Sequence, residues 1–535
     1  MKCSVLVGPP GCGKTDKIHE TIIGCPQRWL LALPRTDLID EQALALTRKA
    51  LSIPLLLPGE AIHNDQPKMN GTVSRRVVQA LQRLRHLDHA FVLVTHAALL
   101  DLDPQHLRGW QVAFDEVPER CVISGAFAAG TSWQTLDRLY ALHPFGMEGR
   151  WCRVVPRVGS DLPTPGEVVH DVAETLREFH RCALTPGRTV LVDIADWQEA
   201  RSTRRKVRWH SCWTPEALLQ HAASVTFAGA NVMESLVYRA AQRAPSGPIA
   251  FVPVQVGTPR TGRPKVVIHY YAHHEGSTVW WGSHDGSRCL VLISEHLAKA
   301  RFDGYWSGND VVLPYLRHRF PGMEVPPKVA GTNALRHHAG CAIFYSSKAQ
   351  TGDEPAMEAL GLNREDIRRA REDEDIIQFV FRGRLRDSSY DGPYEVHLYS
   401  QRQAEMLRAY LISNKITDDI DLVPVRDAGV MEIERPQPKV GKRPEVDPVT
   451  RAEREEARAE KARVRAKKNR DKKKAEKART TESTAAEGRV STDFQMSGGT
   501  ELKTAPPSVP PKRRTSEVGA VAMPVHPNPA VLPPP

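Results

Sequence analysis

Short apolar runs alternate with longer mixed segments along the chain from Met1 to about Pro436. The apolar runs are rich in Val, Leu, Ile and Phe, and runs of this kind indicate strands that are buried on both faces of a parallel sheet. The segments between several of them suit the helices that connect parallel strands. The expected strands are Cys3–Val7, Trp29–Leu33, Phe91–Thr95, Val112–Phe114 and Ser224–Phe227 in a first set, and Ile249–Val254, Val266–Tyr271, Cys289–Ile293, Cys341–Tyr345 and Tyr394–Tyr399 in a second.

This pattern predicts an α/β protein that has two parallel α/β units and a tail. We expect the first unit over residues 1–240, with a helical insertion at about 120–220 that explains the long gap before its last strand. The second unit is expected over residues 245–436. Residues 437–535 are rich first in Ala, Glu, Lys and Arg and then in Ser, Thr, Gly and Pro. They lack an apolar stripe that could dock on a core, so we expect a disordered, basic, Pro-rich tail.

The formal net charge of +10 is concentrated in the tail. Between Arg451 and Arg479, 14 basic and 6 acidic residues give a net charge of about +8, which leaves the remaining chain close to neutral. An acidic partner of the body must therefore bind through a local groove rather than through a general basic surface.

The composition also bears on the compartment and on metals. No apolar run approaches the ~20 residues that cross a bilayer, and the start of the chain does not resemble a signal peptide. Nine cysteines without a C-x-x-C pair argue against a zinc ribbon or a disulfide framework. We therefore expect a cytoplasmic protein with no membrane partner. Cys partners and HExxH spacing, which would predict a transition-metal site, are also lacking around His269, His273, His274, His284, His337 and His338.

The first expected strand leads directly into a phosphate-binding loop. The loop matches G-x-x-x-x-G-K-[ST] at every fixed position and stands between a strand and the start of a helix. Backbone N–H groups and the helix N-terminus suit phosphate oxygens. Lys14 would reach the β- and γ-phosphates of ATP, and Thr15 would bind Mg²⁺. The residues of the loop are Gly8, Pro9, Pro10, Gly11, Cys12, Gly13, Lys14 and Thr15.

Two further groups of residues suit phosphoryl chemistry. Asp115 and Glu116 directly follow an apolar strand. Asp115 suits the Mg²⁺ shell, and Glu116 suits the positioning and polarisation of the water that attacks the γ-phosphate. Far downstream, Gln378, Arg382 and Arg386 are spaced four residues apart, so on one helix they would share a face and point into one cleft.

Together these motifs resemble those of superfamily 2 helicases of the DEAD/DEAH type. The DEVP box and the divergent Gln/Arg motif look like the versions encoded by phages and integrated mobile elements. The resemblance covers the chain from about Met1 to about Pro436. It implies two RecA-like motor domains that hydrolyse ATP with Mg²⁺ in the cleft between them. It also implies that Gln378, Arg382 and Arg386 reach across to ATP bound on the first domain.

The same resemblance implies contacts with nucleic acid. The stretches LALPRTDLIDEQ, VLVTHAALL and KVAGTNALRHHAG resemble motifs Ia, Ib and V, which touch the nucleic-acid backbone. The residues that it assigns to these contacts are Arg35, Thr36, Thr95, His96, Gly331, Thr332 and Asn333. The alternatives are helix capping for Thr36 and a hydrogen-bonded histidine at a strand end for His96. Only seven residues precede Gly8, so the Q motif of DEAD-box RNA helicases is not expected, which favours a DNA motor.

The expected function is thus an ATP-dependent helicase or translocase in the cytoplasm of a bacterial host cell. Its partners would be single- or double-stranded DNA, with RNA as the other candidate, and replication or recombination proteins bound through the tail. The alternative is an AAA+-type loader or switch ATPase that assembles nucleoprotein complexes without unwinding, because such proteins often carry GPPGCGKT. A further alternative is a nucleic-acid-binding scaffold whose ATPase is vestigial.

Deletion of the tail after about Val440 should weaken binding to nucleic acid and flatten the plot of log K against log salt, because fewer phosphate contacts release fewer counterions. Basal ATP hydrolysis should survive, since every motor motif lies upstream. Binding titrations of the full chain and the truncated chain at several salt concentrations measure both slopes. Equal slopes would show that the tail does not contact phosphates.

Overall fold

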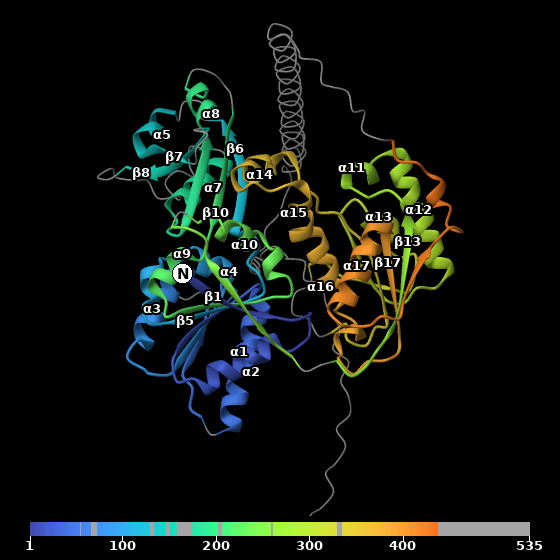
Figure 1. Ribbon diagram of the computed structural model, residues 1–535, viewed down its shortest axis with the longest axis horizontal. Helices are drawn as coiled ribbons and strands as arrows, with labels where there is room; N and C mark the ends of the chain where they lie inside the picture. Colours follow the sequence, from blue (N-terminus) through green and yellow to red (C-terminus); the bar gives the residue numbers. More distant parts are fainter. Residues whose placement is uncertain are drawn as a thin grey trace, which may run out of the picture. The chain divides into compact units, whose positions relative to one another are not determined.

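The computed structural model describes residues 1–53, 55–65, 72–128, 133–145, 150–157, 174–201, 206–244, 246–257, 260–328 and 334–436. The expected tail and the predicted contacts Gly331, Thr332 and Asn333 lie outside the described residues. Within these ranges the chain builds three sheets, two of them entirely parallel (Figure 1). No helix in the described part of the chain has the length and apolar character needed to span a membrane.

The first parallel sheet has helices on both faces. Its strand order is β12-β1-β11-β5-β2-β4-β3. The strands are β1 (Lys2–Val7), β2 (Arg28–Leu33), β3 (Gly59–Ala61), β4 (Ala90–Thr95), β5 (Gln111–Asp115), β11 (Ser224–Ala228) and β12 (Ala250–Gln255). One face packs on α1 (Lys14–Gly24) and α2 (Thr36–Ser52). The other face packs on α3 (Val73–Leu84), α4 (His96–Leu100), α9 (Glu216–His221) and α10 (Leu236–Ala241).

The second parallel sheet is built in the same way. Its order is β15-β14-β16-β17-β13-β18. The strands are β13 (Lys265–Ala272), β14 (Tyr305–Gly308), β15 (Met323–Glu324), β16 (Gly340–Phe344), β17 (Pro393–Ser400) and β18 (Ile420–Pro424). One face packs on α16 (Glu374–Val380) and α17 (Gln401–Ser413). The other packs on α11 (Thr278–Trp281), α12 (His284–Lys299) and α13 (Leu313–Leu316).

The continuous apolar runs are explained by the helices that cover both faces of each parallel sheet. Along β2, Trp29, Leu31 and Leu33 belong to the core beneath α1 and α2, whereas Leu30 and Ala32 belong to the core on the opposite face. A strand that is covered on both sides has to be apolar at every position, because alternate side chains point to opposite faces. The expected α/β class with two parallel α/β sheets is therefore confirmed.

Three details differ from the expectation. The segment expected as a helical insertion contains a five-stranded antiparallel sheet, of order β6-β10-β9-β8-β7, with short helices on it. Its elements are β6 (Val122–Ala128), α5 (Trp133–Leu139), β7 (Tyr140–Phe145), β8 (Trp151–Pro156), α7 (Glu174–Leu184), β9 (Arg188–Asp193), α8 (Ile194–Glu199) and β10 (Lys206–Trp213). The expected strand Cys289–Ile293 lies inside α12, whose buried residues recur at helical spacing and whose N-cap is Ser283. The strand expected at Ile249–Val254 is β12, which pairs with β1 of the first sheet.

A helical segment of the later chain packs into the core of the first sheet. It comprises α14 (Glu354–Leu360), α15 (Arg364–Arg368) and a π-helical turn, Arg369–Asp373, that runs into α16. Leu360, Leu362 and Ile367 belong to the same buried cluster as the core of β5 and β11. In addition, Arg150 of the antiparallel sheet pairs with Glu358 of α14. The segment thus joins the antiparallel sheet, the first parallel sheet and α16.

Acid should destabilise the fold through buried histidines, of which His210 on β10 is the clearest. Its ring is fully buried and, among the described residues, neither ring nitrogen has a hydrogen-bond partner. Burial lowers the pKa of His210 to about 3. An unfolded histidine titrates near 6.5. Below pH 6.5 the unfolded chain therefore binds a proton at this histidine that the folded chain does not bind. The free energy of unfolding falls as the pH drops toward 3.

We expect His210→Leu to remove up to about 1.4 kcal/mol per pH unit from the slope of unfolding free energy between pH 6 and 4. Urea denaturation at several pH values measures the slope. His284→Gln is the control, because its side chain is 93% exposed. The same slope in wild type and His210→Leu would contradict the assignment.

Candidate functional site

The phosphate-binding loop lies between β1 and α1, as expected. Gly11 and Gly13 have φ angles of 84° and 88°, which glycine adopts without strain. The Lys14 ammonium donates to the carbonyl oxygens of Gly8 at 2.7 Å and Pro9 at 2.9 Å. These are weak substitutes for phosphate oxygens, so Lys14 is placed to exchange them for an anion that enters the loop.

Thr15 and Asp115 meet at the carboxyl end of the first sheet. The Thr15 hydroxyl donates to the carboxylate of Asp115, and lies 3.0 Å from each of its oxygens. Burial, and after it the neighbouring charge of Glu116, raises the pKa of Asp115 to about 7. A buried carboxylate of this kind is stabilised by a cation, and a hydroxyl beside a carboxylate is a donor set that Mg²⁺ accepts. The two residues therefore fit a Mg²⁺ ion.

Glu116 is held in a strained turn directly after β5. Its φ angle is 72°, and its N–H donates to the Ala228 carbonyl at the end of β11 at 2.7 Å. Its carboxylate accepts a hydrogen bond of 3.2 Å from the Gln378 amide of α16. A non-glycine residue persists in this conformation only where its surroundings impose it, and such residues cluster at functional sites.

A chain of hydrogen bonds leads from Glu116 into the second sheet's helices. Arg382 donates to the Gln378 carbonyl oxygen at 3.1 Å, and the Gln378 amide donates both to Glu116 and to Glu374, the latter at 3.0 Å. Arg382 is 4% exposed, and its Nε has no partner among the described residues. A buried guanidinium with an unused donor is a binding group for an anion.

The three residues expected on one helix come together by a different route. Helix α16 ends at Val380, so Arg382 lies in the following turn and Arg386 in a short 3₁₀ helix. The expectation of a single helix is therefore wrong. The local sequence pattern gives no sign of what ends α16. The hydroxyls of Tyr305 and Tyr394, from other strands, donate to the Val380 carbonyl at 3.1 and 2.8 Å and so satisfy the helix end.

Arg386 lies against the phosphate-binding loop. A Cβ atom added at Gly11 would be 2.4 Å from Arg386 Cγ and 2.9 Å from the Arg386 carbonyl oxygen. Burial, and after it the nearby charge of Arg382, lowers the pKa of Arg386 to about 10. The buried Arg382 and the half-buried Arg386 repel each other close to the predicted phosphate-binding loop, so both would be stabilised by an anion between them.

Two cavities border this set of residues. One, of about 250 Å³, is lined by Glu116, Gln378 and Arg382. The other, of about 820 Å³, is bordered by Gly11, Arg386 and other residues of the loop and the second sheet's unit. The larger cavity is in the size range of small-molecule sites.

The expected nucleic-acid contacts divide into two groups. Arg35 and Thr36 lie at the start of α2, at the carboxyl end of the sheet, and Arg35 pairs with Asp37 at 2.9 Å. Thr95 caps α4 by accepting a hydrogen bond of 3.2 Å from Ala98 N–H. His96 is 7% exposed and bonds the Asp115 carbonyl at 3.0 Å. The last two therefore have structural partners where they stand, in line with the alternative considered for His96.

Glu374 is a member of the site that the sequence reasoning did not identify. It is half-buried and accepts hydrogen bonds from Gln378 and from Asn231, which lies in the loop after β11. Burial raises the pKa of Glu374 to about 6, and the charge of Glu116 adds to the effect. The available signal was its position one helical turn before Gln378.

A scan against protein-family models and a search of curated proteins both found no match. Among solved structures, the chain is similar to an apo structure of XPD, with a TM-score of 0.43, 11% identity, and 79% of this chain and 97% of that chain covered. It is also similar to Xpd4 of S. tokodaii, with a TM-score of 0.42, 11% identity and coverage of 79% and 96%. A third is Dbp5 of S. cerevisiae bound to RNA and ADP BeF3, with a TM-score of 0.33, 9% identity and coverage of 80% and 86%. These are partial similarities of chain arrangement, so we base the proposed function on the residues of the cleft.

The contact between the loop and Arg386 can be tested with two alanine substitutions. Gly13→Ala should lower the free energy of unfolding by roughly 1–2 kcal/mol, because the positive φ of Gly13 disfavours a side chain. Nothing lies within 4 Å of the added Cβ. Gly11→Ala should lower the free energy of unfolding further, because its Cβ would also displace Arg386. Denaturation without nucleotide measures both losses. Equal losses would show that Arg386 does not pack on the loop in solution.

Proposed function

We propose that the protein is an ATP-dependent nucleic-acid helicase or translocase of the superfamily 2 type, which hydrolyses ATP between its two parallel α/β units. The observation that carries the proposal is the hydrogen-bonded chain from Arg382 through Gln378 to Glu116. It brings a buried arginine and a candidate water-positioning carboxylate from different sheets to one place beside a phosphate-binding loop. That arrangement suits phosphoryl transfer to water.

Each residue then has a defined task. Lys14 and the loop N–H groups hold the β- and γ-phosphates, and Thr15 and Asp115 hold Mg²⁺, which supplies charge neutralisation at the phosphates. Glu116 orients the attacking water and accepts its proton. Arg382 and Arg386 stabilise the charge that develops on the transferred group, while Gln378 positions Arg382 and Glu116 relative to each other.

ATP would thus serve as the bridge that stabilises the closed arrangement of the two units. Hydrolysis removes the γ-phosphate, so the arginines lose their anion and the arrangement loosens. If each unit grips a nucleic-acid backbone, alternate loosening moves the protein along it in a sequence-tolerant way. Arg35 and Thr36 are the best-placed grip residues of the first unit. Thr95, His96, Gly331, Thr332 and Asn333 stay predictions.

DNA is the proposed substrate, with RNA as the competing candidate. The second parallel sheet, which has six strands, favours a motor of two α/β units rather than an AAA+-type loader. Such a loader would carry a small helical lid at that place. The expectations of a phage or mobile-element type, and of replication or recombination partners, stay predictions. They concern features that no part of the described cleft addresses.

Arg382→Ala should bind ATP nearly as well as wild type but hydrolyse it at least about 10³-fold more slowly. The loop makes most ground-state contacts, whereas an arginine on the γ-phosphate acts on charge that appears in the transition state. Arg384→Ala is the matched control, because Arg384 is exposed and stacks on Tyr390 instead. Nucleotide titration and steady-state ATPase assays separate binding from hydrolysis.

The same assays should be run with single-stranded DNA, duplex DNA and RNA side by side. Stimulation of wild-type hydrolysis by a nucleic acid, lost in Arg382→Ala and kept in Arg384→Ala, is the expected result. Absence of stimulation by all three would refute the motor, and equal defects in the two variants would reduce Arg382 to one charge of a basic surface. Rescue of Arg382→Ala by mixing with Lys14→Ala would move the assignment to the ring-forming ATPase.

A further inference from the structure

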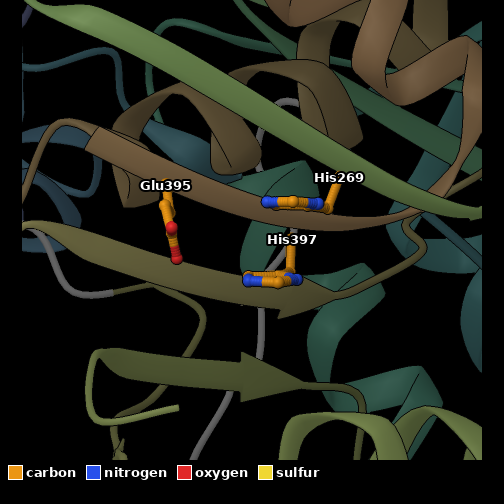
Figure 2. Close-up of side chains that lie close together, drawn as sticks. All are labelled: His269, Glu395 and His397. Atoms are coloured by element: carbon orange, nitrogen blue, oxygen red, sulfur yellow. The ribbon is translucent and has the colours of Figure 1, made fainter. Parts of the chain in front are cut away.

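Two histidines and a glutamate converge on the second sheet, outside the proposed ATP site. Register pairs His269 of β13 with His397 of β17, and Glu395 precedes His397 by two residues on the same strand. Side chains two residues apart point to the same face of a sheet. One nitrogen from each ring and one carboxylate oxygen lie within 4.8 Å of one another (Figure 2).

These donor atoms have little else to bind. Within the described residues, neither the His269 ring nor the Glu395 carboxylate forms a hydrogen bond or an ion pair. The rings stack with centroids 4.5 Å apart and an angle of 12° between their planes. His397 is 4% exposed, His269 is half-buried and Glu395 is exposed, so the cluster opens to solvent on the Glu395 side. In the described part of the chain His397 has one hydrogen-bond partner, Tyr271, at its Nδ1 atom.

The outer contacts of the cluster also suit a metal ligand. Tyr271 Oη lies 3.1 Å from Nδ1 of His397 and 3.1 Å from Nδ1 of His296. A hydroxyl can accept from one ring and donate to the other. When His397 Nδ1–H donates to the Tyr271 oxygen, and the Tyr271 hydroxyl donates to His296, the lone pair of His397 Nε2 is left for a ligand. A second-layer hydrogen bond of this kind fixes the tautomer and orientation of metal-binding histidines in general.

We propose that His269, Glu395 and His397 form a site for a divalent transition-metal ion of the Zn²⁺ class. Two imidazoles and one carboxylate are the donors that Zn²⁺ accepts, with the remaining position filled by water. Imidazole ligands disfavour Mg²⁺ and Ca²⁺, so this site and the proposed Mg²⁺ site select different ions. Burial lowers the pKa of both His269 and His397, which keeps the rings in the neutral form that binds metals.

Ligand bonds of ~2.0–2.2 Å place tetrahedral donors roughly 3.3 Å apart. The donor atoms must therefore approach one another on binding. Glu395 supplies most of this movement because its side chain is exposed, and His269 supplies the rest by turning about χ2, a soft torsion. His397 is fixed by its bond to Tyr271 and serves as the anchor.

The position of the site predicts its effect. His269 and His397 lie on the sheet face that carries Tyr271 and packs on α12, whereas α16, with Gln378, packs on the opposite face. A bound ion would join β13 to β17 without touching the cleft. It would therefore stabilise the second unit and leave the residues of the cleft in place.

Zinc titration of the full, tag-free, chelator-stripped chain tests the proposal. Calorimetry should give one site that is weakened at least tenfold in His269→Gln and in Glu395→Gln. Zn²⁺ should raise the melting temperature of wild type but not of these variants, and Co²⁺ should give the visible absorption of a four-coordinate ion. His284→Gln, an exposed histidine outside the cluster, should behave as wild type.

Both variants change half-buried or exposed side chains, so they should fold, and their circular dichroism without metal checks this. Absence of a zinc site in wild type, or equal affinity in wild type and both cluster variants, would overturn the proposal. Neither result depends on ATP hydrolysis, so the metal site and the motor function are tested independently of each other.

Discussion

A neutral amide separates two opposite charges of the cleft. Arg382 and Glu116 do not form an ion pair; each bonds instead to the side chain of Gln378. A direct buried ion pair would be costly to open, because breaking one leaves an uncompensated charge in a low-dielectric interior. Single hydrogen bonds to a charged group contribute only about 1.5–3 kcal/mol. At this point of the cleft the two parallel units are thus joined by bonds weak enough for a phosphate to replace.

The base of α16 is fixed by a network of charged side chains. Arg402 bonds Asp373 at 2.8 Å and Glu372 at 3.0 Å, and also pairs with Glu275 at 3.0 Å. Glu372 is nearly fully buried, and its second oxygen accepts from Ser347 N–H at 2.9 Å. Several hydrogen bonds to the same buried carboxylates hold the local backbone in place. Gln378 is consequently presented from a fixed platform.

Local sequence patterns were sufficient to place the candidate site residues that belong to one short segment. The phosphate-binding loop and the Asp115–Glu116 pair each follow an apolar strand, and the parallel topology brings those strand ends to one edge. Patterns were insufficient where distant residues decide the outcome. Tyr305 and Tyr394 terminate α16 from other strands. The apolar run at Cys289–Ile293 has no feature that separates a strand from one face of a helix.

Strand register likewise brings together two histidines that the sequence pattern does not connect. His269 and His397 are far apart in the sequence and neither belongs to a spaced motif, so only the pairing of β13 with β17 brings them together. For His96 the sequence left two interpretations open, and the choice depended on which carbonyl group lies within reach after folding.

The helical segment α14–α15 restricts where the molecule can bend. Its Leu360, Leu362 and Ile367 are part of the first sheet's core, while α16 is part of the second. Withdrawing even one of these side chains would cost about 1.5–3 kcal/mol, so the segment has to travel with the first sheet when the cleft opens. The chain between them is the π-helical turn Arg369–Asp373, a form of helix with one residue more per hydrogen-bonded loop than the α-helix. Because Arg402 of α17 binds Glu372 and Asp373, the last two residues of this turn belong with the second sheet, so a change of arrangement between the two sheets would be taken up by residues 369–371.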